Sequence, residues 1–123
     1  MIEGAVNANL EAVLALALEN ATGGVQEIEA VVDTGFNGYL TLPPVLVEDM
    51  RLPVVGDGAA VLADGSEATF DVHRVTVVWD GRPMYVEAAA VGVDPLVGMA
   101  LLRGHNLNMD VKNGGHVQIR ANV

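Results

Sequence analysis

The stretch Ala30-Val31-Val32-Asp33-Thr34-Gly35 is the most informative part of the sequence, because an apolar run ends there in an acid and a turn. Just upstream, residues 27–30 alternate between glutamate and apolar side chains, which predicts a β-strand with one solvated face. An acid at the end of such a strand is expected to be partly buried, in a setting that suits acid–base chemistry. On spacing alone, a helix-cap or turn acid explains Asp33 equally well.

Turn signals recur at short intervals on both sides of this stretch, and the segments between them predict further strands. The clearest turns are Asp57-Gly58, Asp64-Gly65, Asp80-Gly81 and Asn113-Gly114-Gly115. Strands are predicted at residues 68–72 and 117–120, and residues 75–79 and 84–91 form the two sides of a hairpin around Asp80-Gly81. This regular alternation of short strands and turns predicts an all-β barrel or sandwich.

Three segments have features that favour an α-helix. Leu10 to Glu19 is rich in Ala, Leu and Glu, which favour helix, but its leucines at 10, 14, 16 and 18 also fit a two-residue period. We interpret it as a strand because it leads into the Asp33 motif. Short helices are predicted from Pro44 to Met50 and from Met99 to Arg103, the second closed by Gly104.

Length and composition limit the classes of function. The 123 residues fit a single domain, 1–123, with a folded surface of roughly 6,300 Å². The net charge of −10 argues against binding to nucleic acid or to an anionic membrane. The chain has no cysteine, which excludes a disulfide framework and a thiolate nucleophile. No basic residue precedes Arg51, so nothing resembles a signal peptide and we expect a cytoplasmic protein.

Most catalytic chemistries lack the residues they need. Ser66 is the only serine, and it lies in a predicted turn rather than in a nucleophile elbow. The three histidines lack the i, i+4 spacing of a metal pair, and we expect two in loops and one exposed on a strand. Asp64-Gly65-Ser66 begins like a calcium loop, but the later ligands are missing, so we interpret it as a turn. We therefore expect no metal and no cofactor.

With Asp33-Thr34-Gly35 after two valines, the sequence resembles the active-site motif of the aspartic proteases, specifically the single-domain, retropepsin-like branch. A second element supports this: Leu96-Val97-Gly98 is followed by a predicted short helix. In the family, such a segment packs beside the catalytic loop. The resemblance spans roughly residues 10–120. It implies an all-β, closed acid-protease barrel with one or two short helices, active as a symmetric dimer.

The resemblance also implies a mechanism and a set of site residues. The motif occurs once, so a homodimer has to supply the second aspartate. Asp33 of each protomer would activate water, Thr34 would brace the two loops across the axis, and Gly35 would allow close backbone approach. A flap over a peptide or protein substrate is expected at residues 60–69. The expected substrate-contacting residues are Ala63, Asp64, Gly65 and Ser66 in the flap, and Leu96, Val97 and Gly98 in the cleft.

The sequence departs from the family at three places. Phe36 follows the motif where retropepsins usually have a small residue, and it could narrow the cleft or pack in the interface. Met99 stands where the retroviral enzymes have arginine, and the flap tip is acidic rather than glycine-rich. Two alternatives stay open beside the endopeptidase: a non-catalytic dimeric module that binds peptides or proteins, and a monomeric all-β structural domain in which Asp33 is a turn acid.

Overall fold

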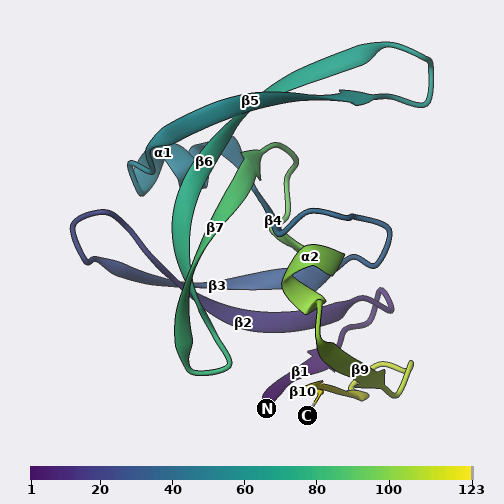
Figure 1. Ribbon diagram of the computed structural model, residues 1–123. Coiled ribbons are helices and arrows are strands. Elements are labelled where there is room, and N and C mark those ends of the chain that lie inside the picture. Colours follow the sequence, from purple (N-terminus) through teal and green to yellow (C-terminus); the bar gives the residue numbers. More distant parts are fainter. Residues whose placement is uncertain (123) are drawn as a thin grey trace.

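The computed structural model describes residues 1–122, which form one mostly β sheet of ten strands with two short helices (Figure 1). The strands are β1 (Ile2–Val6), β2 (Ala12–Glu19), β3 (Val25–Val32), β4 (Leu40–Leu42), β5 (Val54–Val61), β6 (Glu67–Trp79), β7 (Arg82–Ala90), β8 (Leu96–Val97), β9 (His105–Met109) and β10 (His116–Ala121). The helices are α1 (Pro44–Asp49) and α2 (Met99–Leu102).

Six of the strands form a near-barrel ring. They follow the order β6-β7-β4-β8-β3-β2, and β2 returns to pair with β6 through Ala17 and Val78. The pairs β3–β8 and β4–β7 are parallel, whereas the other pairings are antiparallel. The parallel β3–β8 pair brings the end of β3 beside the start of α2, although more than sixty residues separate them in the chain.

The core fills the inside of this ring. Strand β2 shows why the two-residue period prevails over helix propensity: Ala12, Leu14, Leu16 and Leu18 are all buried on one face. The facing strands contribute Val75, Val77 and Trp79 from β6, and Val97 from β8. The interpretation of residues 10–19 as a strand is therefore confirmed, except that Leu10 lies outside β2 and is exposed.

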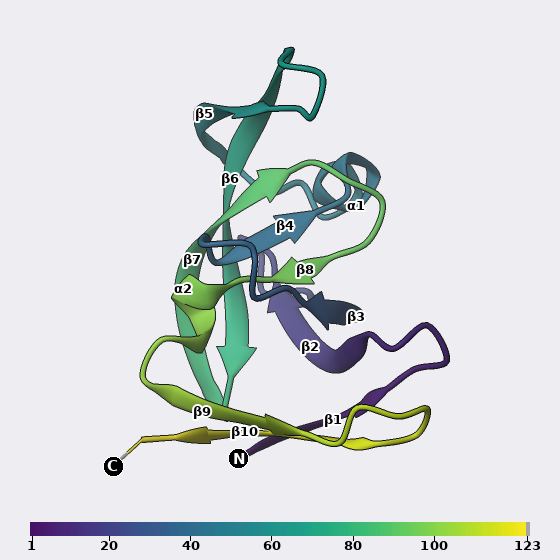
Figure 2. The same ribbon diagram turned by 90° about the vertical axis from the view of Figure 1, so that its right-hand side faces the viewer.

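Two extensions leave the ring at opposite ends (Figure 2). At one end, β5 pairs with the first half of β6 in a long hairpin, residues 54–72, which we call the arm. At the other end, β1, β10 and β9 form a three-stranded layer that carries both termini. Almost every residue of β5 is exposed, and the total accessible surface of 7453 Å² exceeds the value expected from chain length by about 1,150 Å².

The structure corrects two of the local predictions and confirms the two predicted helices. The strands expected at residues 68–72 and 75–79 are one continuous strand, β6. The helices at 44–50 and 99–103 are confirmed to within one residue. All three histidines lie in strands, and His73 is buried, with Nδ1 2.9 Å from the carbonyl oxygen of Leu52. The prediction of two loop histidines and one exposed strand histidine was therefore wrong: a backbone carbonyl satisfies the buried ring.

No helix within residues 1–122 is long and apolar enough to cross a membrane.

Candidate active site

Asp33 lies immediately after β3 and is held there by the main chain of β8. Its N–H donates to the carbonyl of Val97 at 2.8 Å, and the N–H of Val31 donates to the carbonyl of Pro95 at 2.9 Å. These bonds continue the parallel ladder in which Val31 pairs with Leu96 and Val32 with Val97. The hydrogen bonds between β3 and β8 therefore extend to Asp33 and fix the position of its backbone.

The loop that follows, residues 33–39, is closed by the start of α2. The N–H groups of Gly98, Met99 and Ala100 donate to the carbonyls of Tyr39 (3.0 Å), Phe36 (2.8 Å) and Gly38 (3.1 Å). The first N–H groups of a helix have no partner inside the helix, so an outside acceptor is needed. Here the Asp33 loop, as we call residues 33–39, supplies those acceptors, and loop and helix form one backbone-bonded unit.

Gly98 is the point of closest approach within this unit. A β-carbon at this position would lie 2.5 Å from ring carbon Cδ2 of Phe36 and in direct collision with the carbonyl oxygen of Gly38. The ring of Phe36 also packs over Gly38, where an added β-carbon would lie 2.5 Å from Cζ. The two glycines therefore make room for Phe36, the residue that follows Asp33-Thr34-Gly35.

The Asp33 carboxylate is oriented from within its own loop. The N–H of Gly35 donates to Oδ1 at 2.9 Å, and the N–H of Phe36 donates to the Asp33 carbonyl at 3.2 Å. Asp33 is partly buried, whereas Thr34 and Gly35 are exposed. The side-chain oxygen Oδ2 receives no hydrogen bond from any residue in 1–122. One oxygen is therefore held in place, and the other remains available for a proton or a water molecule.

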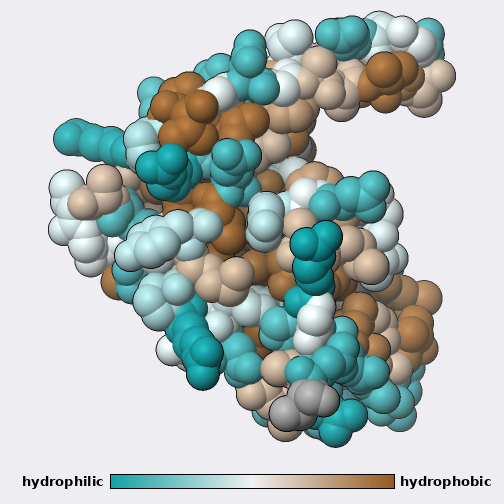
Figure 3. Space-filling model, in the orientation of Figure 1, coloured by the Kyte–Doolittle hydropathy of each residue, from teal (hydrophilic) through white to brown (hydrophobic). Residues whose placement is uncertain are grey.

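The other predicted site residues divide into two groups. Leu96, Val97 and Gly98 lie directly against the Asp33 loop, with Val97 fully buried and Leu96 partly exposed. Ala63, Asp64, Gly65 and Ser66 form the exposed tip of the arm. The arm projects from the body, and an open hollow lies beneath it (Figure 3).

Hydrogen bonds within the tip set the shape of its turn. Asp64 Oδ1 accepts hydrogen bonds from the hydroxyl and the N–H of Ser66, and Gly65 adopts a φ of 84°, a conformation that suits glycine. The Ser66 hydroxyl and then its N–H lower the pKa of the Asp64 carboxyl from its ordinary value of 3.8. The contacts that order the tip are thus present while Asp64 is ionised, and they weaken as the pH falls through that lowered pKa.

We expect Ser66→Ala to raise the pKa of Asp64 toward 3.8, because the largest stabilising hydrogen bond to the carboxylate is removed. The measurement is a pH titration of the Asp64 carboxyl carbon by NMR. Ser66→Thr, which keeps a hydroxyl, is the control and should retain the low value. An unchanged midpoint in Ser66→Ala would show that this hydroxyl does not stabilise the ionised carboxylate.

A pocket of about 190 Å³ opens beside the Asp33 loop, and the sequence analysis did not find it. We call it the Phe36 pocket. Its lining residues are Phe36, Gly38, Tyr39, Leu40, Phe70, Val72, Glu87 and Ala89. In the predicted strand at residues 68–72, Phe70 and Val72 are two residues apart and therefore share one face. No local signal linked that face to the Asp33 loop, because the pairing of β6, β7 and β4 creates the contact.

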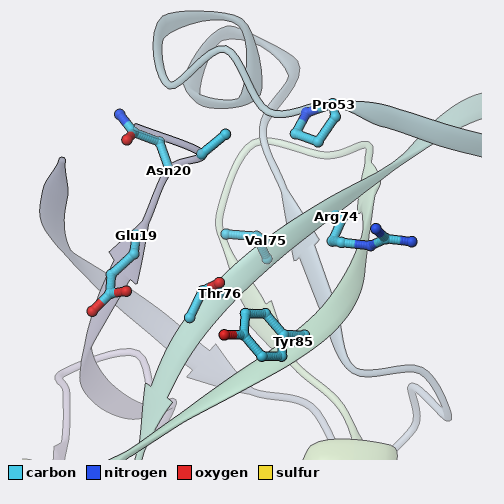
Figure 4. Close-up of a pocket in the computed structure, with 8 residues that line it drawn as sticks. Glu19, Asn20, Pro53, Arg74, Val75, Thr76 and Tyr85 are labelled. Atoms are coloured by element: carbon cyan, nitrogen blue, oxygen red, sulfur yellow. The ribbon is translucent and has the colours of Figure 1, made fainter. Parts of the chain in front are cut away.

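A second pocket, of about 260 Å³, lies between the end of β2 and strands β6 and β7 (Figure 4). It is lined by Glu19, Asn20, Ala21, Pro53, Arg74, Val75, Thr76 and Tyr85. It shares no residue with the Asp33 loop or with the tip of the arm. Within residues 1–122, no cluster of three or more His, Asp or Glu side chains could hold a metal ion in this pocket or elsewhere.

No protein-family model matches the sequence, and no curated protein matches it either.

Proposed function

We propose that this chain is a retropepsin-like aspartic endopeptidase that acts as a homodimer, with Asp33 of each protomer in one shared active site. The observation that carries the proposal is the backbone-bonded unit of the Asp33 loop, β8 and α2. It holds a partly buried carboxylate at a strand end, with one oxygen oriented by the Gly35 N–H. Such rigid positioning is what a general acid or base requires.

A dimer supplies what one protomer lacks. The protomer has one Asp33 loop, and hydrolysis by a pair of carboxyls needs two. Thr34 and Gly35 are exposed on this loop, so a second copy can approach the carboxylate closely. The surface exceeds the value expected for a monomer by about 1,150 Å², which is comparable to the roughly 800 Å² that each partner buries in a standard interface. The symmetric arrangement is an isologous contact around a twofold axis.

The chemistry follows from two carboxyls held side by side. Both cannot ionise cheaply at close range, so the pair shares one proton. The ionised Asp33 removes a proton from a water held between the two carboxyls, and that water attacks the carbonyl carbon of the scissile peptide. The protonated Asp33 donates to the carbonyl oxygen, which gives a gem-diol. The Asp33 that took the water proton then passes it to the nitrogen as the C–N bond breaks. The other Asp33 takes a proton back from one gem-diol hydroxyl as the carboxyl product forms, so the pair again shares one proton. No covalent intermediate forms, in keeping with a chain whose one serine lies at an exposed turn.

The arm acts as the flap in this proposal. An extended peptide lies in the hollow between the arm and the Asp33 loop, and its backbone bonds to the strands around it. The residues that flank the arm anchor its root: the N–H of Arg74 donates to the carbonyl of Pro53, and His73 Nδ1 lies 2.9 Å from the carbonyl oxygen of Leu52. A hairpin anchored at its root, with an exposed tip, can lift to admit a substrate and close to exclude water.

The test is digestion of a diverse peptide mixture, from mildly acidic to neutral pH, by the native protein and by Asp33→Ala in parallel. Cuts made only by the native protein establish the endopeptidase. If both preparations are silent at concentrations where the native protein is dimeric, the proposal fails and a non-catalytic binding module replaces it. Equal cutting by both preparations would mean that Asp33 has no catalytic role.

Activity per protomer should fall steeply on dilution, because the site exists only in the dimer. We expect the dilution at which half the activity is lost to match the dissociation constant measured by sedimentation. Added peptide ligand should shift both midpoints to lower protein concentration by mass action. Constant specific activity in samples that sediment as monomers would contradict the shared site.

A further inference from the structure

We propose that the Phe36 pocket binds an arginine side chain of the peptide substrate and that Glu87 is the residue that selects it. This inference rests on the proposed function to the extent that a peptide occupies the hollow beside the Asp33 loop. It goes further by naming the chemical class of side chain that the site prefers.

The pocket is continuous with the Asp33 loop. Phe36 accepts the N–H of Met99 with its backbone carbonyl and donates its own N–H to Asp33, while its ring lines the pocket. Tyr39 and Leu40 extend the same wall into β4. A peptide that crosses Asp33 in an extended conformation advances about 3.3 Å per residue, so one of its side chains near the scissile bond reaches this wall.

The opposite wall comes from the root of the arm and from β7. Val72 pairs with Ala89 and Arg74 pairs with Glu87, so these four side chains share one face of the β6–β7 ladder. Phe70 lies two residues before Val72 on the same strand and also lines the pocket. The substrate side chain would therefore lie between the Asp33 loop and the base of the flap.

The composition of the pocket selects the ligand. Three of the lining residues, Phe36, Tyr39 and Phe70, are aromatic, and aromatic rings suit an apolar stem or a planar cation. Glu87 is the only charged residue in the lining, and it is exposed. Aromatic faces with one carboxylate match arginine, whose guanidinium stacks on rings and can donate two hydrogen bonds to one carboxylate.

The carboxylate of Glu87 is free to accept such a partner. Its cross-strand neighbour Arg74 makes no ion pair with it, and the ion pair found within residues 1–122 joins the Met1 amino group to Asp80. The positive charge of Arg74 on the same face weakens the attraction for an incoming arginine. Removing that charge should therefore strengthen the preference, whereas removing the charge of Glu87 should abolish it.

Twofold symmetry predicts the arginine preference at two positions of the peptide. Each protomer of the proposed dimer contributes one Phe36 pocket, so a peptide crossing the axis meets two pockets, one on each side of the scissile bond. We expect the arginine preference at two positions related by this symmetry and at no others. This distinguishes the pocket from a general attraction between a basic peptide and an acidic protein, which would act at every position.

The experiment uses a position-scanned peptide series in which arginine, citrulline or glutamate is placed at each site around the scissile bond. Citrulline is nearly isosteric with arginine but uncharged. For the native protein we expect kcat/KM to be about two- to fivefold higher for arginine than for citrulline at the two positions, the size typical of an exposed ion pair. Glu87→Gln should make kcat/KM equal for the arginine and citrulline peptides.

Two control variants separate this effect from net charge. Glu27→Gln removes one negative charge from β3, outside the pocket, and should leave the arginine preference intact. Arg74→Gln should enlarge it. If the native protein shows no preference for arginine, or if the preference remains in Glu87→Gln, the arginine proposal is overturned. The proposed endopeptidase activity is not affected by either result.

Binding separates this proposal from the proposed function. The same peptides are titrated into Asp33→Asn and into the double variant with Glu87→Gln. Suppose that the native protein cuts nothing, but that Asp33→Asn binds arginine peptides more tightly than citrulline peptides and that the double variant does not. The pocket assignment then holds and the endopeptidase fails. If the peptides are neither cut nor bound, both proposals are overturned.

Discussion

Replacing Asp33 with asparagine is expected to lower kcat by about two to four orders of magnitude, the usual contribution of a positioned general acid or base. Asparagine keeps the shape of the side chain, and its oxygen can still accept the Gly35 N–H that now binds Oδ1. The fold, the dimer and peptide binding should therefore survive. The measurement is kcat and KM on one peptide together with the sedimentation of both proteins.

Mixing the two proteins gives a sharper test, because the proposed site is shared between two protomers. After subunit exchange at equal amounts, about one quarter of the dimers contain two native protomers if pairing is random. Activity should therefore follow the square of the native fraction, and an excess of Asp33→Asn should suppress the native protein. A linear dependence on the native fraction would mean that each protomer carries a complete site, in conflict with the proposal.

Replacing Gly98 with alanine is expected to have the largest effect of any single methyl group added near the site. The new β-carbon would collide with the carbonyl oxygen of Gly38 and with the ring of Phe36, and the first of these belongs to the backbone of the Asp33 loop. Overpacking of this kind costs about 1–3 kcal/mol, and more where the backbone has to move. We expect urea unfolding at lower denaturant concentration, together with a loss of activity larger than the loss of stability explains.

Gly56→Ala is the matched control for that substitution. Gly56 lies in β5, its φ is not positive, and an added β-carbon would meet no other atom within 4 Å. This variant should unfold within about 0.5 kcal/mol of the native protein, as surface substitutions usually do. If Gly98→Ala were as stable and active as Gly56→Ala, the tight contact between α2 and the Asp33 loop would be needed neither for stability nor for activity.

The sequence predicted the parts of the fold that local pattern determines. Residues 10–19 were interpreted as a strand because they lead into the Asp33 motif, and β2 at residues 12–19, with its alternating buried face, confirms this against the helix propensity of the segment. Pro44 and Gly104 placed the two helices, since a proline suits a first helical position and Gly104 adopts a φ of 77° that ends the turn. The acid that ends β3 was correctly expected to be partly buried.

The remaining parts depend on partners that are distant in the sequence. Strands β1, β4 and β9 were not predicted: Gly4 interrupts the first, the second has three residues, and asparagines occupy the outer positions of the third. Each exists because a neighbouring strand offers it hydrogen bonds. The buried state of His73 depends in the same way on the Leu52 carbonyl, and the Phe36 pocket on the pairing of β4 with β7.

The unit formed by the Asp33 loop and α2 is joined by main-chain atoms, and this leaves the neighbouring side chains free to diverge. Met99 contributes its N–H to the carbonyl of Phe36, while its side chain is 45% exposed and unconstrained by that bond. Substitutions at residues 39 and 99 can therefore accumulate without removing any of the main-chain hydrogen bonds that position the Asp33 loop. In the proposed endopeptidase, substrate preference can therefore change during evolution while the position of the carboxylate is kept.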